Sequence, residues 1–195
     1  MRSPTYWHPL FYQTAMRLLY GRGFADRYRA VASAIPTGCS VVDICCGDAY
    51  LFRRFLSEEA VTYLGLDINP VFVRWLLRRG VPAREFDVRS DAIPEADVIL
   101  MQASLYQFIP DERKILDKMV SSARRCVVLA EPIKNLSTSS SPVLSWLGRR
   151  LTDPGTGEVP SRFDTDRLGR LVEPYKTDMF ELIAGGRESL VRIVV

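Results

Sequence analysis

Residues 40–70 read SVVDICCGDAYLFRRFLSEEAVTYLGLDINP, and this stretch determines the fold class. It contains two short apolar runs, 40–45 and 61–66, which are followed by Gly47 and Asp67. Between them, apolar residues recur at helical spacing: Leu51, Phe52, Phe55 and Leu56. A strand, a helix and a second strand in this order predict a βαβ unit with parallel strands.

The alternation of strands and helices continues beyond Asp67. Asn69 is a typical N-cap and Pro70 a typical first helical residue, and Gly80 is a typical stop for that helix. Further strands are predicted at 84–88, 97–102 and 126–131. The nearly continuous apolar character of the middle one predicts burial on both faces of a parallel sheet. The sequence therefore predicts an α/β protein.

The two ends of the chain follow different patterns. Residues 9–20 and 24–35 have the spacing of short amphipathic helices, and short helices are also predicted at 142–151 and 164–173. Residues 180–184 and 189–195 flank a Gly185-Gly186 turn, which predicts an antiparallel hairpin at the end of the sheet.

Composition excludes several classes of protein. The 195 residues (22.1 kDa) are 47% hydrophobic and 25% charged, as expected for one globular domain and not for a disordered chain. No apolar run approaches the roughly 20 residues of a membrane-spanning helix, and the N-terminal stretch lacks the apolar segment of a secretory signal. The net charge of +3 is scattered, which argues against a nucleic-acid-binding surface.

Cysteine usage argues against a metal site. The four cysteines form no CxxC pair and His8 is the only histidine, so no Cys/His zinc site is predicted. Reduced thiols and the lack of a signal predict a cytoplasmic protein.

Three acidic residues, Asp43, Asp67 and Asp87, stand at or near the ends of successive predicted strands. In an open parallel sheet, ligands bind beyond these ends. The turn after Asp43 can present N–H groups to a carboxylate or phosphate, Asp67 can accept from ribose hydroxyls, and Asp87 can accept from an amino group such as that of adenine. Each acid alone could simply cap the next helix, but their joint spacing favours a ligand site.

At these residues the sequence resembles the class I S-adenosylmethionine-dependent methyltransferases. Residues 41–49 resemble the acid and glycine-rich turn of the family's first motif, and 64–70 resemble its second strand with the ribose-binding acid. The resemblance covers about residues 38–131. It implies a Rossmann-like three-layer sandwich, with a mostly parallel seven-stranded sheet that ends in an antiparallel hairpin and N-terminal helices as a lid.

The resemblance also implies a cofactor, S-adenosylmethionine (SAM), with S-adenosylhomocysteine (SAH) as its product. Its site would comprise eight residues: Asp43, Cys45, Gly47, Asp67, Ile68, Asp87, Val88 and Gln102. Asp43 and the turn at 45–47 would hold the methionine part, and Gln102 would lie near the methionine amino group and the sulfonium. Asp67 would bind the ribose, and Ile68 and the 86–88 segment would contact adenine.

The implied layout is a single domain, 1–195, in four parts. These are an N-terminal helical lid (1–37), a cofactor-binding core (38–131), a substrate-side cover (132–173) and a C-terminal hairpin (174–195).

The turn departs from the family pattern, which usually has glycine at the positions of Cys45 and Ala49. Both side chains are small and we expect them to be tolerated, but a cofactor-free relative remains an alternative. Dinucleotide binding is a more distant alternative, because only Gly47 remains of a Gly-x-Gly-x-x-Gly pattern.

Methyl transfer from a sulfonium depends mainly on in-line placement of the acceptor, and a general base is needed only if the acceptor must lose a proton. Candidate bases are Tyr106, Glu131 and His8, although His8 in its aromatic-rich segment is more simply a packing residue. We therefore predict a methyltransferase for a small-molecule acceptor. The alternatives are a catalytically inactive binding or scaffold protein, or a methyltransferase acting on RNA, protein or lipid; the oligomeric state is left open.

Overall fold

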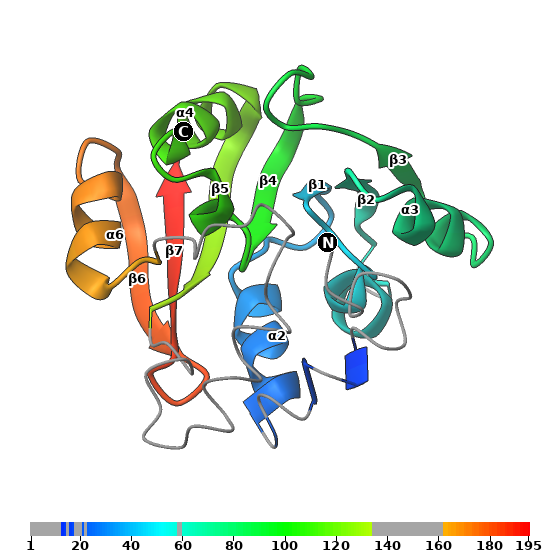
Figure 1. Ribbon diagram of the computed structural model, residues 1–195, viewed down its shortest axis with the longest axis horizontal. Helices are drawn as coiled ribbons and strands as arrows, with labels where there is room; N and C mark the ends of the chain where they lie inside the picture. The colour runs from blue at the N-terminus through cyan, green and yellow to red at the C-terminus, as the bar shows by residue number, and fades with distance from the viewer. Residues whose placement is uncertain (1–12, 15, 18–20, 22, 58–59, 134–161) are drawn as a thin grey trace.

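The structure is a computed structural model, and it describes residues 13–14, 16–17, 21, 23–57, 60–133 and 162–195. Within these residues the chain forms one seven-stranded sheet with the strand order β3-β2-β1-β4-β5-β7-β6 (Figure 1). The strands are β1 (Ser40–Ile44), β2 (Thr62–Asp67), β3 (Ala83–Glu85), β4 (Ala96–Gln102), β5 (Ala123–Pro132), β6 (Thr177–Ile183) and β7 (Glu188–Val194). β1 to β5 are parallel, and β7 runs antiparallel to its neighbours β5 and β6.

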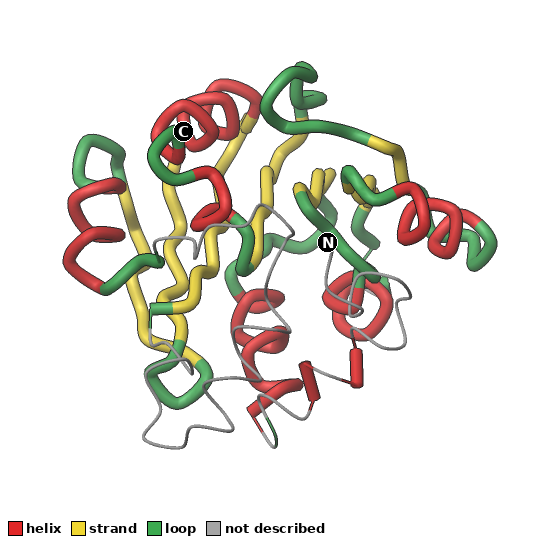
Figure 2. Tube along the Cα trace, viewed as in Figure 1, coloured by secondary structure: helices red, strands yellow, loops and turns green. Residues whose placement is uncertain are grey.

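Helices cover both faces of this sheet (Figure 2). One face is covered by α2 (Gly23–Ser33), the π-helical turn η2 (Phe52–Leu56) and α3 (Pro70–Leu77). The other is covered by the 3-10 turn η3 (Leu105–Phe108), α4 (Glu112–Ser122) and α6 (Thr165–Val172). The structure is therefore the three-layer sandwich with a terminal antiparallel hairpin that the sequence predicted.

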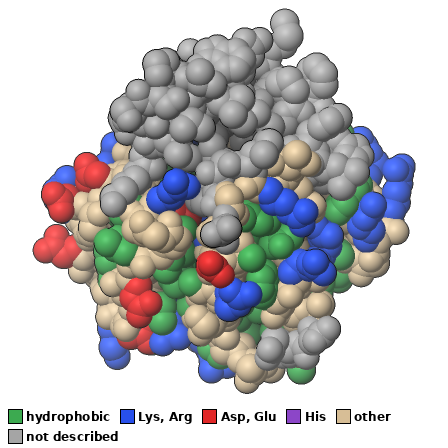
Figure 3. Space-filling view, turned by 90° about the horizontal axis from the view of Figure 1, so that it is seen from below, with side chains coloured by type: hydrophobic (Ala, Val, Ile, Leu, Met, Phe, Trp, Pro, Cys, Tyr) green, Lys and Arg blue, Asp and Glu red, His purple; other side chains and the backbone are tan. Residues whose placement is uncertain are grey.

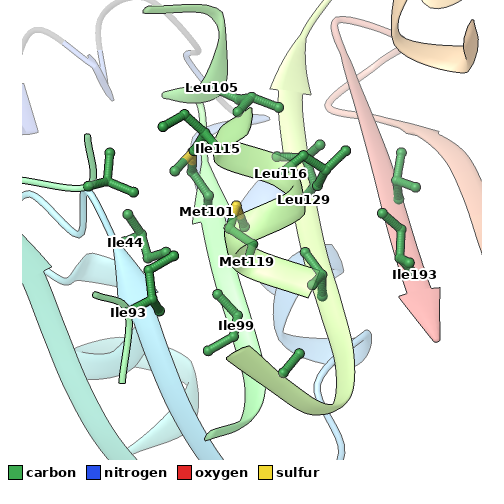
Figure 4. Packing of buried hydrophobic residues seen from close by; sticks show 14 of the residues in the cluster. Ile44, Ile93, Ile99, Met101, Leu105, Ile115, Leu116, Met119, Leu129 and Ile193 are labelled. Carbon is green, nitrogen blue, oxygen red and sulfur yellow. The ribbon is translucent and has the colours of Figure 1, made fainter. Parts of the chain in front are cut away.

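Two hydrophobic cores lie on the two faces because successive strand residues point to opposite sides. Figure 4 shows the core under α4, where Ile115, Leu116 and Met119 pack against side chains of β4 and β5. Residues 98–101 of β4 are fully buried, which confirms the predicted burial on both faces.

Local signals place α3 where the sequence predicted it. The side chain of Asn69 accepts a hydrogen bond from the N–H of Val71 at 3.0 Å, and Pro70 is the first helical residue. The helix itself ends at Leu77, and Gly80 closes the following turn with a φ of +71°.

Several boundaries differ from the prediction. The third strand, predicted at 84–88, is only Ala83–Glu85, because Phe86 and Val88 turn into the core and the N–H of Asp87 donates to Asp91. β5 starts three residues earlier than predicted, at Ala123, and α2 ends at Ser33. The predicted helix at 142–151 and most of 9–20 lie outside the described residues, so the lid assigned to 1–37 stays a prediction.

None of the described helices is long and apolar enough to cross a membrane. The four cysteines are free thiols, and the described part of the chain contains no cluster of metal-binding side chains.

Candidate functional site

The strand order brings the carboxyl ends of β2, β1, β4 and β5 together at one edge of the sheet. Asp67, Asp43, Gln102 and Glu131 stand at or next to these ends. β4 and β5 run downward in Figure 1, so Figure 3 views the molecule from this edge, where basic, acidic and hydrophobic side chains are interspersed on the described surface. The four candidates are thus on one edge, as the parallel sheet requires.

The turn after β1 has the left-handed backbone that favours glycine at three positions, two of which are not glycine. Cys45, Gly47 and Ala49 have φ values of 58°, 55° and 49°, all in the left-handed region. This conformation costs a residue with a Cβ roughly 1–2 kcal/mol, and packing of the side chains offsets part of that cost. Ala49 is buried in the core under α2, and Cys45 packs against the opposite core. The two departures from glycine are therefore accommodated without loss of the turn.

Asp67 joins this turn to the start of α3. Its Oδ2 accepts from the N–H of Gly47 at 2.8 Å, and its Oδ1 accepts from the N–H of Asn69 at 2.8 Å. The next residue, Ile68, is 46% exposed, which is unusual for an isoleucine beside a core strand. Asp67, which anchors the turn, is thus followed directly in the chain by an apolar side chain that is open to solvent.

Asp43 is 5% exposed, and its Oδ2 accepts a hydrogen bond from the hydroxyl of Tyr63 at 2.8 Å. Burial raises the pKa of Asp43, the Tyr63 hydrogen bond lowers it, and nearby Asp67 and Asp48 raise it, which together bring it to about 7. Sequence reasoning missed Tyr63. The available signal was Gly65, because a glycine inside a strand often marks a close approach of other atoms.

Gly65 has no room for a side chain. A Cβ there would lie 2.8 Å from Sγ of Cys46 and 3.2 Å from the hydroxyl of Tyr63. We expect Gly65→Ala to lower the free energy of unfolding by about 1–3 kcal/mol, and adding Cys46→Ala to recover part of that loss. Urea denaturation of the single and double variants measures both effects.

Gly169→Ala in α6 is the matched control, because a Cβ at this position meets nothing within 4 Å. It should raise stability by up to about 1 kcal/mol. Equal effects of alanine at the two glycines would contradict a crowded site at Gly65.

Asp87 and Val88 follow β3. Val88 is buried, whereas the carboxylate of Asp87 pairs with Arg89 at 2.6 Å and also accepts from the N–H of Arg89. The side-chain hydrogen bond from Arg89 lowers the pKa of Asp87. The structure therefore gives Asp87 a turn-stabilising contact, and its contact with adenine stays a prediction.

Gln102 ends β4 with an unsatisfied donor. Its Nε2 is buried and has no hydrogen-bond partner among the described residues. Leaving a buried amide unpaired costs about 1–3 kcal/mol, so a ligand that accepts this hydrogen bond would remove that cost. Together with the exposed Ile68 and the strained turn, this donor fits a ligand that combines polar and aromatic parts.

Glu131 is fully buried and caps η3. Its carboxylate accepts from the N–H groups of Ser104 and Leu105 at 2.8 Å each and from that of Tyr106 at 3.3 Å. Burial raises its pKa to about 7, although the three N–H groups lower it. These bonds engage both carboxylate oxygens, so the geometry is that of a residue that positions the segment after β4.

Tyr106, the second candidate base, is also buried, and burial raises its pKa. The guanidinium carbon of Arg162 lies 4.8 Å from its ring centroid. His8, the third candidate, lies outside the described residues. Tyr106 and Glu131 are therefore brought together, and neither has the exposure of a side chain that exchanges protons freely with solvent.

The raised pKa of Glu131 predicts a pH-dependent stability. Because its pKa rises from 4.5 to about 7 on folding, the folded protein binds this proton more tightly, so stability is lost as pH rises through this window. Asp43 contributes with the same sign. We expect Glu131→Gln to flatten the profile by up to about 1.4 kcal/mol per pH unit between pH 5 and 7.

Chemical denaturation at several pH values measures this slope. The exposed Glu173→Gln is the matched control and should leave the profile as in the wild type. A Glu131→Gln profile parallel to that of the wild type would contradict the assignment.

Comparisons with known proteins agree with this geometry. A family model described as methionine biosynthesis protein MetW matches residues 25–133, more than half of the chain. No curated protein sequence matches it.

Solved structures are similar over most of the chain. One is a chain of the complex between the Haloferax volcanii Trm112 methyltransferase activator and the putative methyltransferase (TM-score 0.73, 12% identity, 100% of this chain and 98% of that one). Another is magnesium protoporphyrin IX methyltransferase from Synechocystis with bound SAH (TM-score 0.66, 15% identity, 93% of this chain and 93% of that one). A third is the cyclase SpnF (TM-score 0.64, 11% identity, 86% of this chain and 79% of that one). At these identities the likeness shows the fold alone, and it confirms the Rossmann-like fold of class I methyltransferases.

Proposed function

This chain belongs to the MetW family, described as methionine biosynthesis protein MetW, and we propose that it is a SAM-dependent methyltransferase for a small-molecule acceptor. The observation that carries the proposal is the turn after β1. Cys45, Gly47 and Ala49, at alternate positions of this turn, all have a left-handed backbone, although two of them are not glycine. The turn is anchored by the hydrogen bond from the N–H of Gly47 to Asp67. Strained backbone of this kind clusters at ligand-binding and active sites.

The residues at the sheet edge fit the cofactor. In the proposed site, Asp43 and the turn at 45–47 hold the methionine part and Asp67 binds the ribose. Ile68, Asp87 and Val88 contact the adenine, and Gln102 presents its amide near the methionine. The fit rests on the unpaired Nε2 of Gln102 and the exposed side chain of Ile68.

When bound, the cofactor supplies an activated methyl group. The protein contributes placement, which accounts for about 7–11 kcal/mol of the barrier in well-oriented reactions. Glu131 holds residues 104–106 through three N–H groups and so fixes Tyr106 beside the end of β4. Tyr106 and Glu131 are more suited to shaping the acceptor site than to removing a proton, and His8 remains the third candidate base.

The rest of the proposed assignment concerns the whole protein. We assign residues 1–37 as the lid and residues 132–173 as the acceptor-side cover of a single domain. We also assign a cytoplasmic location, which is in keeping with four free thiols.

A catalytically inactive binding protein is the second candidate, favoured by the side chains of Cys45 and Ala49 at positions where glycine is usual. The cyclase among the similar structures shows that this fold is not confined to methyl transfer. Macromolecular acceptors and an activator protein, as in the Haloferax complex, are further alternatives.

Titration calorimetry with SAM, SAH and NAD tests the proposal. We expect micromolar binding of SAM and SAH and none of NAD. Binding without transfer to any acceptor would favour the binding protein, and no binding at millimolar SAM by folded protein would exclude the proposed function.

A further inference from the structure

Tyr63 lies beside the candidate cofactor site without being part of the turn. It is 4% exposed, and its hydroxyl donates to Oδ2 of Asp43 at 2.8 Å. Among the described residues, no other hydrogen bond to this carboxylate is present, so Tyr63 is the donor that holds it in place.

Three neighbours fix the position of the tyrosine ring. Asp43 pairs with Gly65 in the register of β1 and β2, and Tyr63 and Gly65 point to the same face because they are two residues apart. Since Gly65 has no Cβ, the hydroxyl passes over it and reaches Asp43; a Cβ there would lie 3.2 Å from the hydroxyl. Phe52 stacks on the ring with centroids 4.1 Å apart and planes 12° apart.

We propose that Tyr63 is a positioning residue for the cofactor: by holding one oxygen of Asp43, it directs the other oxygen toward the ammonium group of the methionine part. This inference rests on the proposed function, because it assumes that Asp43 contacts the cofactor.

The charges around Asp43 explain why a donor is needed. The titratable groups that act on it come from β2, the turn and α2: Tyr63, Asp67, Asp48, Cys45, Cys46 and Tyr28. Burial raises the pKa of Asp43, the Tyr63 hydroxyl lowers it, and the acids Asp67 and Asp48 raise it. Tyr63 therefore favours the ionised carboxylate that pairs with an ammonium group.

Tyr63→Phe tests the proposal, because it removes the hydroxyl and keeps the ring that stacks on Phe52. We expect the titration midpoint of the Asp43 carboxyl, followed by carbon NMR, to rise by about one pH unit. Because a carboxyl with a pKa of about 7 is half ionised at pH 7, affinity for SAH should fall about fivefold at pH 7 and recover toward the wild-type value at pH 9.

Tyr50→Phe is the matched control. Tyr50 is a buried tyrosine on the same face, whose ring lies 4.7 Å from that of Tyr28. It should leave both the midpoint and the pH profile of binding unchanged.

Two results would overturn the proposal while wild-type protein binds SAH: an unchanged Asp43 midpoint in Tyr63→Phe, or a loss of affinity that is the same at every pH. Failure of the proposed function is a separate result, in which the wild-type protein binds neither SAM nor SAH at any pH and the positioning role falls with it.

Discussion

Asp67→Ala is expected to weaken SAH binding at least about a hundredfold. In the proposed site its carboxylate accepts from two ribose hydroxyls, and each hydrogen bond to a charged group contributes about 1.5–3 kcal/mol. The same carboxylate holds the N–H groups of Gly47 and Asn69, so its loss also loosens the turn. Both effects act in the same direction on affinity.

Titration calorimetry at pH 8 measures this loss, with thermal unfolding to confirm that the variant is folded. Asp178→Ala is the control, because Asp178 is a carboxylate on the edge strand β6 that pairs with Arg192 at 2.8 Å. It should bind SAH like the wild type. An Asp67→Ala affinity within about threefold of the wild type would show that Asp67 only supports the turn.

Glu188→Ala is expected to lower the free energy of unfolding by about 3–5 kcal/mol. Glu188 and Arg27 form a fully buried ion pair at 3.0 Å, with side chains 0% and 1% exposed, which joins α2 to the first residue of β7. Removing one partner leaves a buried charge without compensation. Because domains of this size are stable by only about 5–15 kcal/mol, the loss is a large fraction of the total.

Urea denaturation measures the cost, and two further variants separate its causes. Asp26→Ala breaks the exposed pair with Arg29 and should cost less than about 1 kcal/mol. Replacing both buried partners, Arg27→Met with Glu188→Leu, should recover most of the loss, because no unpaired charge remains. If Glu188→Ala costs no more than Asp26→Ala, the buried pair does not stabilise the packing of α2.

Local signals were enough to predict most of the fold. Strand positions, the Asn69 cap and the Gly185-Gly186 turn depend on residues close together in the chain, whose conformational preferences act wherever the segment lies. Boundaries were less accurate. The third strand is shorter than predicted because Phe86 and Val88 turn into a core formed by distant elements.

The candidate site was predicted in part. Asp43, Asp67, Gln102 and Glu131 lie at one edge of the sheet because parallel strands place their carboxyl ends together. Their partners were not predicted: Tyr63 for Asp43, and the N–H groups of 104–106 for Glu131.

The sequence by itself therefore determined the class of fold, the turn after the first strand and the acids at the strand ends, because periodicity and turn residues act over a few neighbouring positions. Only the tertiary structure decided what those acids contact. Asp43 and Tyr63 are 20 residues apart, and Arg27 and Glu188 are 161 apart. Such pairs depend on strand register and on which face each side chain takes, and these are set when the whole sheet is assembled.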